Sequence, residues 1–256
     1  MKNLSTAPLK AVILAAGVGS RIQPLTNDCP KSLLEVAGQP ILERMICNCL
    51  NCGISEFILV LGYLNDRIRD FVATTFPKID VTYIVNKKYT ETNTGYSLML
   101  AAKAVGGTGF IKFDADVVFD TKILRRLISS PFEVALCIDR AIQLDAEEVK
   151  VIVDDEFRVL RASKDVNPKE ALGESIGIEK INGDTAEKLF AELTQMMAQD
   201  HHHQAYYEAA YERLMAKDFV FHAVDVTGLN WTEIDTHDDF VSANEMFAIP
   251  TSAKNP

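Results

Sequence analysis

The sequence contains no long apolar segment and no excess of basic residues. Its opening residues, MKNLSTAPLK, lack the apolar core of a secretion signal, and no stretch approaches about 18 uninterrupted apolar residues. We therefore expect a soluble, cytoplasmic protein with no membrane partner. Because 36 acidic residues outnumber 26 basic ones, the formal net charge is −10, which argues against a nucleic-acid partner. A local basic pocket for a nucleotide remains compatible with this balance.

Cysteine is scarce and unevenly placed. The chain has 5 cysteines in 256 residues, an odd number in a protein long enough to form a core without disulfides. Three of them lie in CNCLNC, where Cys47 and Cys49 would point to nearly opposite sides of a helix. No second Cys/His pair follows at the spacing of a zinc site. We therefore expect reduced, packed thiols.

Several catalytic signatures are also missing. The glycines of GVGSRI are not followed by the third glycine of a dinucleotide-binding turn, because Ile22 stands in its place. The spacing of a P-loop is absent, and no Ser–His–Asp or Cys–His arrangement indicates a covalent intermediate. The HHH run at 201–203 lies in a polar segment and is expected to form a solvated loop.

Buried strands and amphipathic helices alternate over the first 139 residues. KAVILAA at 10–16 is a continuous apolar run typical of a strand buried on both faces, and PILERMICNCLNCG at 40–53 has helical spacing. Further expected elements are strands at 56–63, 81–86, 109–119 and 133–139 and helices at 66–76, 95–105 and 121–129. Such βαβ units predict a mostly parallel sheet with helices on both faces.

The pattern changes after residue 139. EVKVIVDDEFRVLRASK at 148–164 alternates around an Asp–Asp–Glu turn, which predicts an antiparallel hairpin. Further expected elements are a strand at 173–181, a mainly helical segment at 183–217, a strand at 219–226 and a last helix that opens near Thr236. We find no repeat, low-complexity tract or long linker, and therefore expect one domain.

Two cations follow the first strand. Gly17 and Gly19 let backbone N–H groups approach an anion closely. Arg21 adds a planar fork for phosphate oxygens and Lys31 a compact charge, while prolines beside both stiffen the loop. Taken singly, each cation suits a solvated surface and the glycines suit an ordinary turn. Together they describe a cradle for a triphosphate.

The stretch LAAGVGSRIQPLTNDCPKSLLEVAGQPIL at 14–42 resembles the signature of the sugar-phosphate nucleotidyltransferase superfamily. The elements L-A-A-G-x-G-x-R, P-L-T, P-K and G-x-P-[IL] are present in order. The resemblance continues weakly to the C-terminus and implies a GT-A-like, Rossmann-type α/β three-layer sandwich with a mostly parallel central sheet and a small antiparallel region. It implies a single nucleotidyltransferase domain over 1–256, with an NTP-binding half at about 8–139 and an acceptor-site-building half at about 140–256.

The resemblance also implies a reaction without a protein nucleophile. An acceptor oxygen attacks the α-phosphorus in line, and positioning with charge neutralisation supplies the catalysis as pyrophosphate leaves. Arg21 and Lys31 would hold the departing phosphates, and Lys164 would neutralise the acceptor phosphate or the α-phosphate, unless it is a surface lysine. The implied nucleotide-binding residues are Leu14, Ala15, Ala16, Gly17, Gly19, Arg21, Lys31, Asn93, Ser97 and Asp114.

Two acidic clusters could bind a metal. Asp114 and Asp116 in FDADVVFD share a face near the C-terminal end of a strand, where parallel sheets bind ligands. Glu233 and Asp235 share a face immediately before the last helix. A solvated turn or a helix cap would explain either cluster alone. Mg²⁺ needs few carboxylates besides phosphate oxygens, and the family resemblance selects Asp116 and Asp235, with Asp114 in reserve.

Three further segments resemble the phosphocholine and 2-aminoethylphosphonate cytidylyltransferase branch. In YTETNTGYSLMLA, Asn93 and Ser97 would contact the base or ribose of CTP, although helix capping by Asn93 is the alternative. GESIGI, and YYEAAYERL before NWTEID, imply an acceptor pocket in which carboxylates and rings receive a cationic headgroup. Aromatic residues at helical spacing also suit a core. The implied acceptor-binding residues are Lys164, Glu174, Tyr207, Glu208 and Trp231.

We therefore expect a Mg²⁺-dependent cytidylyltransferase that transfers CMP from CTP to phosphocholine or 2-aminoethylphosphonate, as a monomer or homodimer. Two alternatives stay open. One is a UTP- or dTTP-dependent sugar-1-phosphate nucleotidyltransferase, and the other is a non-catalytic nucleotide-sensing module. The cations and the acid pair together disfavour the module, because sensing does not require the metal.

Overall fold

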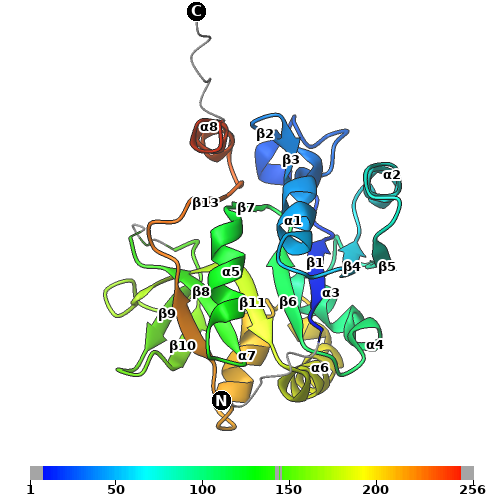
Figure 1. Ribbon diagram of the computed structural model, residues 1–256. Coiled ribbons are helices and arrows are strands. Elements are labelled where there is room, and N and C mark those ends of the chain that lie inside the picture. The colour runs from blue at the N-terminus through cyan, green and yellow to red at the C-terminus, as the bar shows by residue number, and fades with distance from the viewer. Residues whose placement is uncertain (1–7, 142–143, 145, 249–256) are drawn as a thin grey trace, which may run out of the picture.

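A mixed sheet of nine strands runs through the computed structural model, which describes residues 8–141, 144 and 146–248 (Figure 1). Its parallel strands are β1 (Lys10–Ala15), β4 (Glu56–Leu61), β5 (Asp80–Val85) and β6 (Phe110–Asp114). β1 lies between β4 and β6 and pairs with both in parallel. Because layers of side chains cover both faces of β1, positions 11–15 are all apolar.

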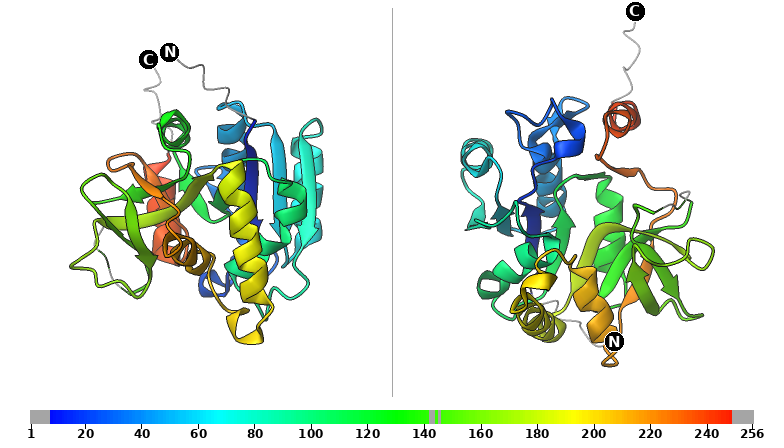
Figure 2. Two further views of the ribbon diagram at one scale, coloured as in Figure 1. Left: turned by 90° about the horizontal axis from the view of Figure 1, so that it is seen from below. Right: turned by 180° about the vertical axis from the view of Figure 1, so that it is seen from behind.

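Helices cover both faces of the sheet (Figure 2). Those on one face are α1 (Ile41–Leu50), α2 (Asn65–Thr75) and α5 (Thr121–Ser129), and those on the other are α3 (Thr94–Leu100), α4 (Ala102–Val105), α6 (Gly183–Met197) and α7 (Glu208–Met215). Ile13 of β1 packs into the first core and its neighbour Val12 into the second, because alternate side chains of a strand point to opposite faces. The predicted three-layer α/β fold is confirmed.

The remaining strands extend the main sheet beyond β6, mostly by antiparallel pairing. β11 (Gly173–Ile181) pairs antiparallel with β6 and with β8 (Ala135–Asp139). The predicted hairpin is formed by β9 (Lys150–Val153) and β10 (Val159–Ser163), and β9 also joins β11. β12 (His222–Asp225) pairs in parallel with β8. All of β11 is buried, so its polar residues lie inside the molecule.

Three expected elements are divided. The strand expected at 109–119 ends at Asp114, and β7 (Val117–Phe119) leaves the sheet to pair with β13 (Trp231–Glu233) (Figure 1). The expected helix at 95–105 is α3 followed by α4. The helical segment at 183–217 is α6, a short 3₁₀ turn at Asp200–His202 and α7, because the polar stretch around 198–206 interrupts its apolar periodicity. The break after Asp114 brings the two acidic clusters together.

The loop that carries the two cations is folded rather than extended. It forms short 3₁₀ turns at Ser20–Ile22 and Lys31–Leu33, then β2 (Glu35–Val36) and β3 (Gln39–Pro40). Ile22, at the position where a dinucleotide-binding turn has glycine, is fully buried in a small core with Ile41 and Ile234. This core fixes the loop against the segment before α8 (His237–Met246).

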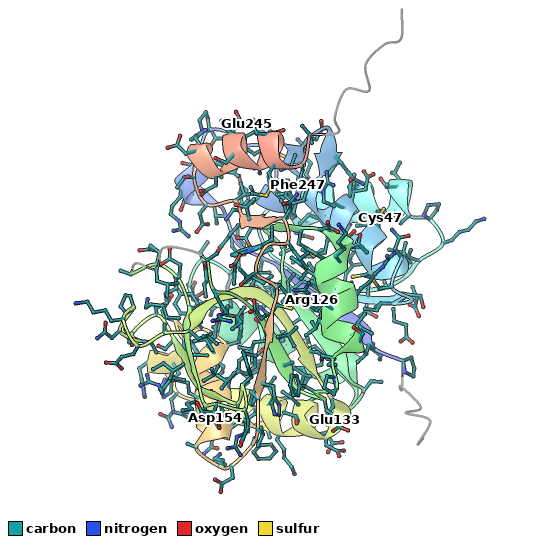
Figure 3. All side chains as sticks on the ribbon, turned by 60° about the vertical axis from the view of Figure 1, so that its left-hand side comes forward. Cys47, Arg126, Glu133, Asp154, Glu245 and Phe247 are labelled. Carbon is teal, nitrogen blue, oxygen red and sulfur yellow. The ribbon has the colours of Figure 1, made fainter. Side chains whose placement is uncertain are left out.

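The last helix is anchored at both ends. Thr236 forms the predicted N-cap of α8 and, with Asp239, a complete capping box. At the other end, the guanidinium carbon of Arg44 lies 5.1 Å from the centroid of the Phe247 ring. Phe247 lies just beyond the end of α8 (Figure 3). All five cysteines are free; Cys49 and Cys137 are buried as expected of packed thiols, and the other three are partly buried. Within the described residues, no helix is long and apolar enough to cross a membrane.

The close approach of β11 to β6 at Gly177 can be tested by the stability of an alanine variant. Its φ is +73°, and a Cβ there would lie 2.6 Å from Asp114 Oδ2 and 3.2 Å from Asp114 Cβ. Gly53 has φ +82° with no described atom within 4 Å of the same position. Both alanine variants should lose about 1–2 kcal/mol to the left-handed backbone, and Gly177→Ala about 1–3 kcal/mol more to overpacking. Urea denaturation measures both, and equal losses would show that the contact with Asp114 is readily relieved.

Candidate active site

A cavity of about 810 Å³ opens at the C-terminal ends of β1 and β6, the edge at which parallel sheets bind ligands. Its walls come from the loop after β1, the β6–β7 segment, β11, the start of α7 and the segment from β13 to α8. The residues predicted from the sequence that line it are Leu14, Ala15, Gly17, Gly19, Arg21, Lys31, Asn93, Asp114, Asp116, Lys164, Glu174, Tyr207, Glu208, Trp231 and Asp235. The fold therefore gathers segments from both halves of the chain at one edge.

Two predicted residues lie behind the wall instead. Ser97 is buried in α3, where its hydroxyl accepts a hydrogen bond from the Asn86 amide at 3.1 Å. Ala16 is also buried, and its carbonyl accepts a backbone N–H. Asn93 lines the cavity, but its side-chain oxygen accepts the Thr94 N–H as the N-cap of α3. The structure thus shows the capping role, and a contact from Asn93 to the base stays a prediction.

Lys31 joins the two acidic clusters. Its Nζ lies 2.7 Å from Asp116 Oδ2 and 2.7 Å from Asp235 Oδ1, although Lys31 and Asp235 are 204 positions apart. Burial opposes the charge of Lys31, but the two carboxylates outweigh it and hold its pKa above the ordinary value. Burial likewise opposes ionisation of Asp116, and Lys31 outweighs it, so the pKa of Asp116 is lowered. Lys31 and Asp116 are therefore both charged at neutral pH.

Glu233 completes a set of three acids. One carboxylate oxygen each from Asp116, Glu233 and Asp235 lies within 4.8 Å of the others. Although Glu233 is exposed at the cavity, packing of protein around its carboxyl and the charges of Asp116 and Asp235 raise its pKa to about 9. A divalent cation would reverse this effect by favouring the ionised form. The sequence placed Glu233 on the same face as Asp235 but did not select it as a ligand.

Arg21 and Lys164 both line the cavity and both lie near Glu147. Arg21 Nη2 lies 2.7 Å from Asp235 Oδ2, and its Nη1 lies 3.4 Å from Glu147 Oε2. Lys164 Nζ is 4.0 Å from the same Glu147 oxygen and 5.0 Å from the centroid of the Tyr206 ring. Both side chains are at least partly exposed, so these contacts are weak and exchangeable. Either cation can therefore turn to an anionic ligand.

The predicted acceptor residues form the part of the cavity next to β11 and α7. Trp231 is held by its indole N–H, which donates to Asp139 Oδ2 at 2.8 Å. Glu174 and Glu208 are both buried residues that line the cavity. Burial raises the pKa of the Glu208 carboxyl to about 7; Lys112 offsets part of this effect and Asp114 adds to it. In the described structure, Glu208 Oε2 is buried with no hydrogen-bond partner.

A buried ionic cluster beneath this part of the cavity escaped sequence analysis. Lys112 of β6 is fully buried, and its Nζ lies 2.7 Å from Asp114 Oδ2 and 2.9 Å from Glu179 Oε2. It also donates to the Tyr207 hydroxyl, which in turn donates to Asp114 Oδ2 at 2.8 Å. Burial, partly offset by Lys112, raises the pKa of Glu179 to about 8. The sequence signal was a lysine inside an apolar strand, in phase with Asp114 and Asp116.

Comparison with known proteins agrees with this geometry. Residues 11–162, more than half of the chain, match the family model described as a MobA-like NTP transferase domain. The CMP-5'-(3-aminopropyl)phosphonate synthase of Streptomyces rubellomurinus is 28% identical over 252 residues, which cover 95% of this chain and 39% of that protein. The choline-phosphate cytidylyltransferase of Haemophilus influenzae is 38% identical over 115 residues, 45% of this chain and 47% of that one. The chain spans less than half the length of these curated relatives.

A solved structure shows the same fold. The CTP:phosphocholine cytidylyltransferase of Streptococcus pneumoniae superimposes with a TM-score of 0.76 at 23% identity, covering 93% of this chain and 99% of that one. The likeness therefore extends beyond the region matched by the family model.

The raised pKa of Glu208 predicts a pH-dependent stability. Between its ordinary pKa of 4.5 and the folded value of about 7, the folded state keeps a proton that the unfolded chain has lost. Stability therefore falls as pH rises through this window, by up to about 3 kcal/mol. Glu208→Gln removes this loss, so its free energy of unfolding should gain on the wild type between pH 5 and pH 8.

Urea denaturation at several pH values measures this difference. Glu245→Gln, an exposed change on α8 (Figure 3), is the control and should follow the wild type at every pH. If Glu208→Gln also ran parallel to the wild type, Glu208 would be ionised in the folded protein at pH 5.

Proposed function

The chain belongs to the family of MobA-like NTP transferase domains, and from that premise we propose that it is a Mg²⁺-dependent cytidylyltransferase. It transfers CMP from CTP to a small phosphonate or phosphate that carries an amine or a quaternary ammonium group (an amine-bearing acceptor below), and it releases pyrophosphate. The observation that carries the proposal is the meeting of Arg21 and Lys31 with Asp116, Glu233 and Asp235 at one edge of the cavity. Phosphate-binding cations and a hard-cation donor set are the two parts that nucleotidyl transfer needs.

The donor set fits Mg²⁺. Asp116, Glu233 and Asp235 offer oxygens only, and their spacing within 4.8 Å allows one ion to contact all three. When bound, Mg²⁺ would neutralise phosphate charge and favour displacement at the α-phosphorus. These three carboxylates would hold the ion, while Arg21 and Lys31 would bind the departing β- and γ-phosphates. Gly17 and Gly19 leave the backbone open to the phosphates.

The acceptor half of the proposal rests on charge. The pocket beside β11 and α7 contains Glu174 and Glu208, which suit an ammonium group, with the Tyr207 ring beside them. We assign Asp114 to this pocket too, and not to the nucleotide as the family resemblance implies, because its carboxylate accepts a hydrogen bond from the Tyr207 hydroxyl. Lys164, at the rim, suits the phosphonate or phosphate oxygens that must reach the α-phosphorus. The names of the Streptomyces and Haemophilus relatives support an aminoalkylphosphonate or phosphocholine as acceptor and CTP as donor. 2-Aminoethylphosphonate and phosphocholine are the leading candidates.

A panel assay tests the donor and the acceptor together. CTP, UTP, dTTP, ATP and GTP are each combined with 2-aminoethylphosphonate, phosphocholine, inositol phosphate and glucose 1-phosphate, and pyrophosphate release is recorded. We expect turnover with CTP and an amine-bearing acceptor. Turnover restricted to UTP or dTTP with glucose 1-phosphate would support the sugar-nucleotide alternative. Nucleotide binding with no turnover would support the sensing module.

Two carboxylate variants test the metal site. Asp116→Ala and Asp235→Ala should each lower turnover by about 100-fold or more, because each removes charge from the site of phosphate neutralisation. Raising the Mg²⁺ concentration should not restore it, since the defect lies in the position of the ion. Asp238→Ala, an exposed acid in the first turn of α8, is the control and should keep the wild-type rate. Near-wild-type turnover by Asp235→Ala would remove the second acidic cluster from the reaction centre.

A further inference from the structure

Lys112 is a buried charge in a place where packing alone calls for an apolar residue. It lies in the middle of β6, paired across the sheet with Val12 on one side and Glu179 on the other, and it is fully buried. Removing an ammonium from water costs several kcal/mol, and a buried ion pair often stabilises a fold no better than apolar residues of similar size. The contacts that Lys112 makes therefore need an explanation besides stability.

Those contacts connect the wall of the cavity to its interior. Lys112 lies behind the wall, whereas Asp114 and Tyr207 both line the cavity. The Lys112 ammonium is 2.7 Å from Asp114 Oδ2 and 3.7 Å from the centroid of the Tyr207 ring, and it donates to the Tyr207 hydroxyl. One buried cation thus contacts two cavity residues that come from different elements, β6 and the N-cap of α7.

The direction of the hydrogen bonds is fixed around this cation. An ammonium can only donate, so the Tyr207 oxygen accepts from Lys112 and uses its own proton to bond Asp114 Oδ2 at 2.8 Å. Asp114 Oδ2 then accepts from two donors at once. Gly177 allows this arrangement, because a Cβ there would lie 2.6 Å from the same oxygen. The carboxylate therefore has one orientation set from beneath.

Glu179 holds Lys112 from the other side. Its Oε2 lies 2.9 Å from the ammonium, and both side chains are fully buried. Because the two residues are register partners on neighbouring antiparallel strands, the pair is as rigid as the sheet itself. Lys112 is in this way fixed to the sheet on one side and fixes the cavity wall on the other.

We propose that Lys112 is a positioning residue for the acceptor, holding Asp114 and Tyr207 so that the bound amine places its phosphonate or phosphate in line with the α-phosphorus. This inference rests on the proposed cytidylyltransferase function. Lys112 does not line the cavity and so does not touch the acceptor. Along the chain it lies two residues before Asp114 and four before Asp116, and is therefore further than either from the edge where the phosphates would bind. Its loss should therefore affect the acceptor more than the nucleotide.

Steady-state kinetics of Lys112→Met test the proposal. Methionine keeps the unbranched shape and removes the charge, so Asp114 and Tyr207 lose their common donor. We expect the KM for the amine-bearing acceptor to rise roughly 10-fold or more. The KM for CTP, and the Kd for CTP measured by equilibrium titration without turnover, should stay within about twofold of the wild type. A purely structural role would lower the melting temperature without separating the two substrates.

Two further variants keep the test decisive. Tyr207→Phe keeps the ring and removes the hydroxyl between Lys112 and Asp114, so it should raise the acceptor KM in the same direction and be non-additive with Lys112→Met. It also decides the question alone if Lys112→Met does not fold. Lys10→Met is the control. Lys10 lies at the opposite end of neighbouring β1, donates to the Ala104 carbonyl at 2.9 Å, and should leave both KM values unchanged.

The outcomes separate this proposal from the proposed function. Suppose that the wild-type enzyme is active and that Lys112→Met and Tyr207→Phe each raise the KM for CTP and the KM for the acceptor equally. This result would overturn the positioning role and leave the cytidylyltransferase function standing. The same holds if neither KM changes. Absence of wild-type turnover with every donor and acceptor would overturn the proposed function, and the role of Lys112 with it.

Discussion

The ammonium of Lys31, held between the carboxylates of Asp116 and Asp235, is the contact on which the rest of the site depends. The charges of Asp116 and Asp235 repel each other and oppose ionisation of the neighbouring Glu233, and Lys31 with Arg21 supplies the opposing charge. The same contact joins the loop after β1, the end of β6 and the segment before α8. Under the proposed function, a bound Mg²⁺ would take the place of the Lys31 ammonium between these carboxylates.

Three alternate residues in and just after β6 connect the buried core to the cavity. Asp116, beyond the end of the strand, faces Lys31 at the edge; Asp114 lines the wall; and Lys112 lies buried beneath it. Asp116 therefore pairs with Lys31 and Asp114 with Lys112, and the two lysines lie in different parts of the fold. Lys31 is partly exposed and belongs to a surface loop, whereas Lys112 is enclosed by the sheet and α7. We infer that the first lysine is exchangeable and that the second is a fixed support.

The sequence predicted the parts of the site that depend on local order. The strand–glycine–cation pattern from Ala11 to Lys31 and the two same-face acid pairs are visible in short windows, and the fold places them together. The cluster around Lys112 was not predictable, because it depends on the register between β6 and β11, which sets Glu179 opposite Lys112. The burial of Ser97 was not predictable for a related reason, because it depends on how α3 packs in the fold. Its position in the first turns of α3 suited a contact with the nucleotide, but its hydroxyl is buried against Asn86.

The most direct test of this account is whether a metal ion competes with the Lys31 ammonium for the carboxylates of Asp116 and Asp235. Mn²⁺ replaces Mg²⁺ as a spectroscopic probe, and electron paramagnetic resonance measures its binding to the free protein. The account predicts weak binding to the wild type alone, tighter binding when CTP is present, and tighter binding to Lys31→Met without nucleotide, because the competing ammonium is gone. Weaker Mn²⁺ binding to Lys31→Met than to the wild type would show that Lys31 does not share its carboxylates with the metal.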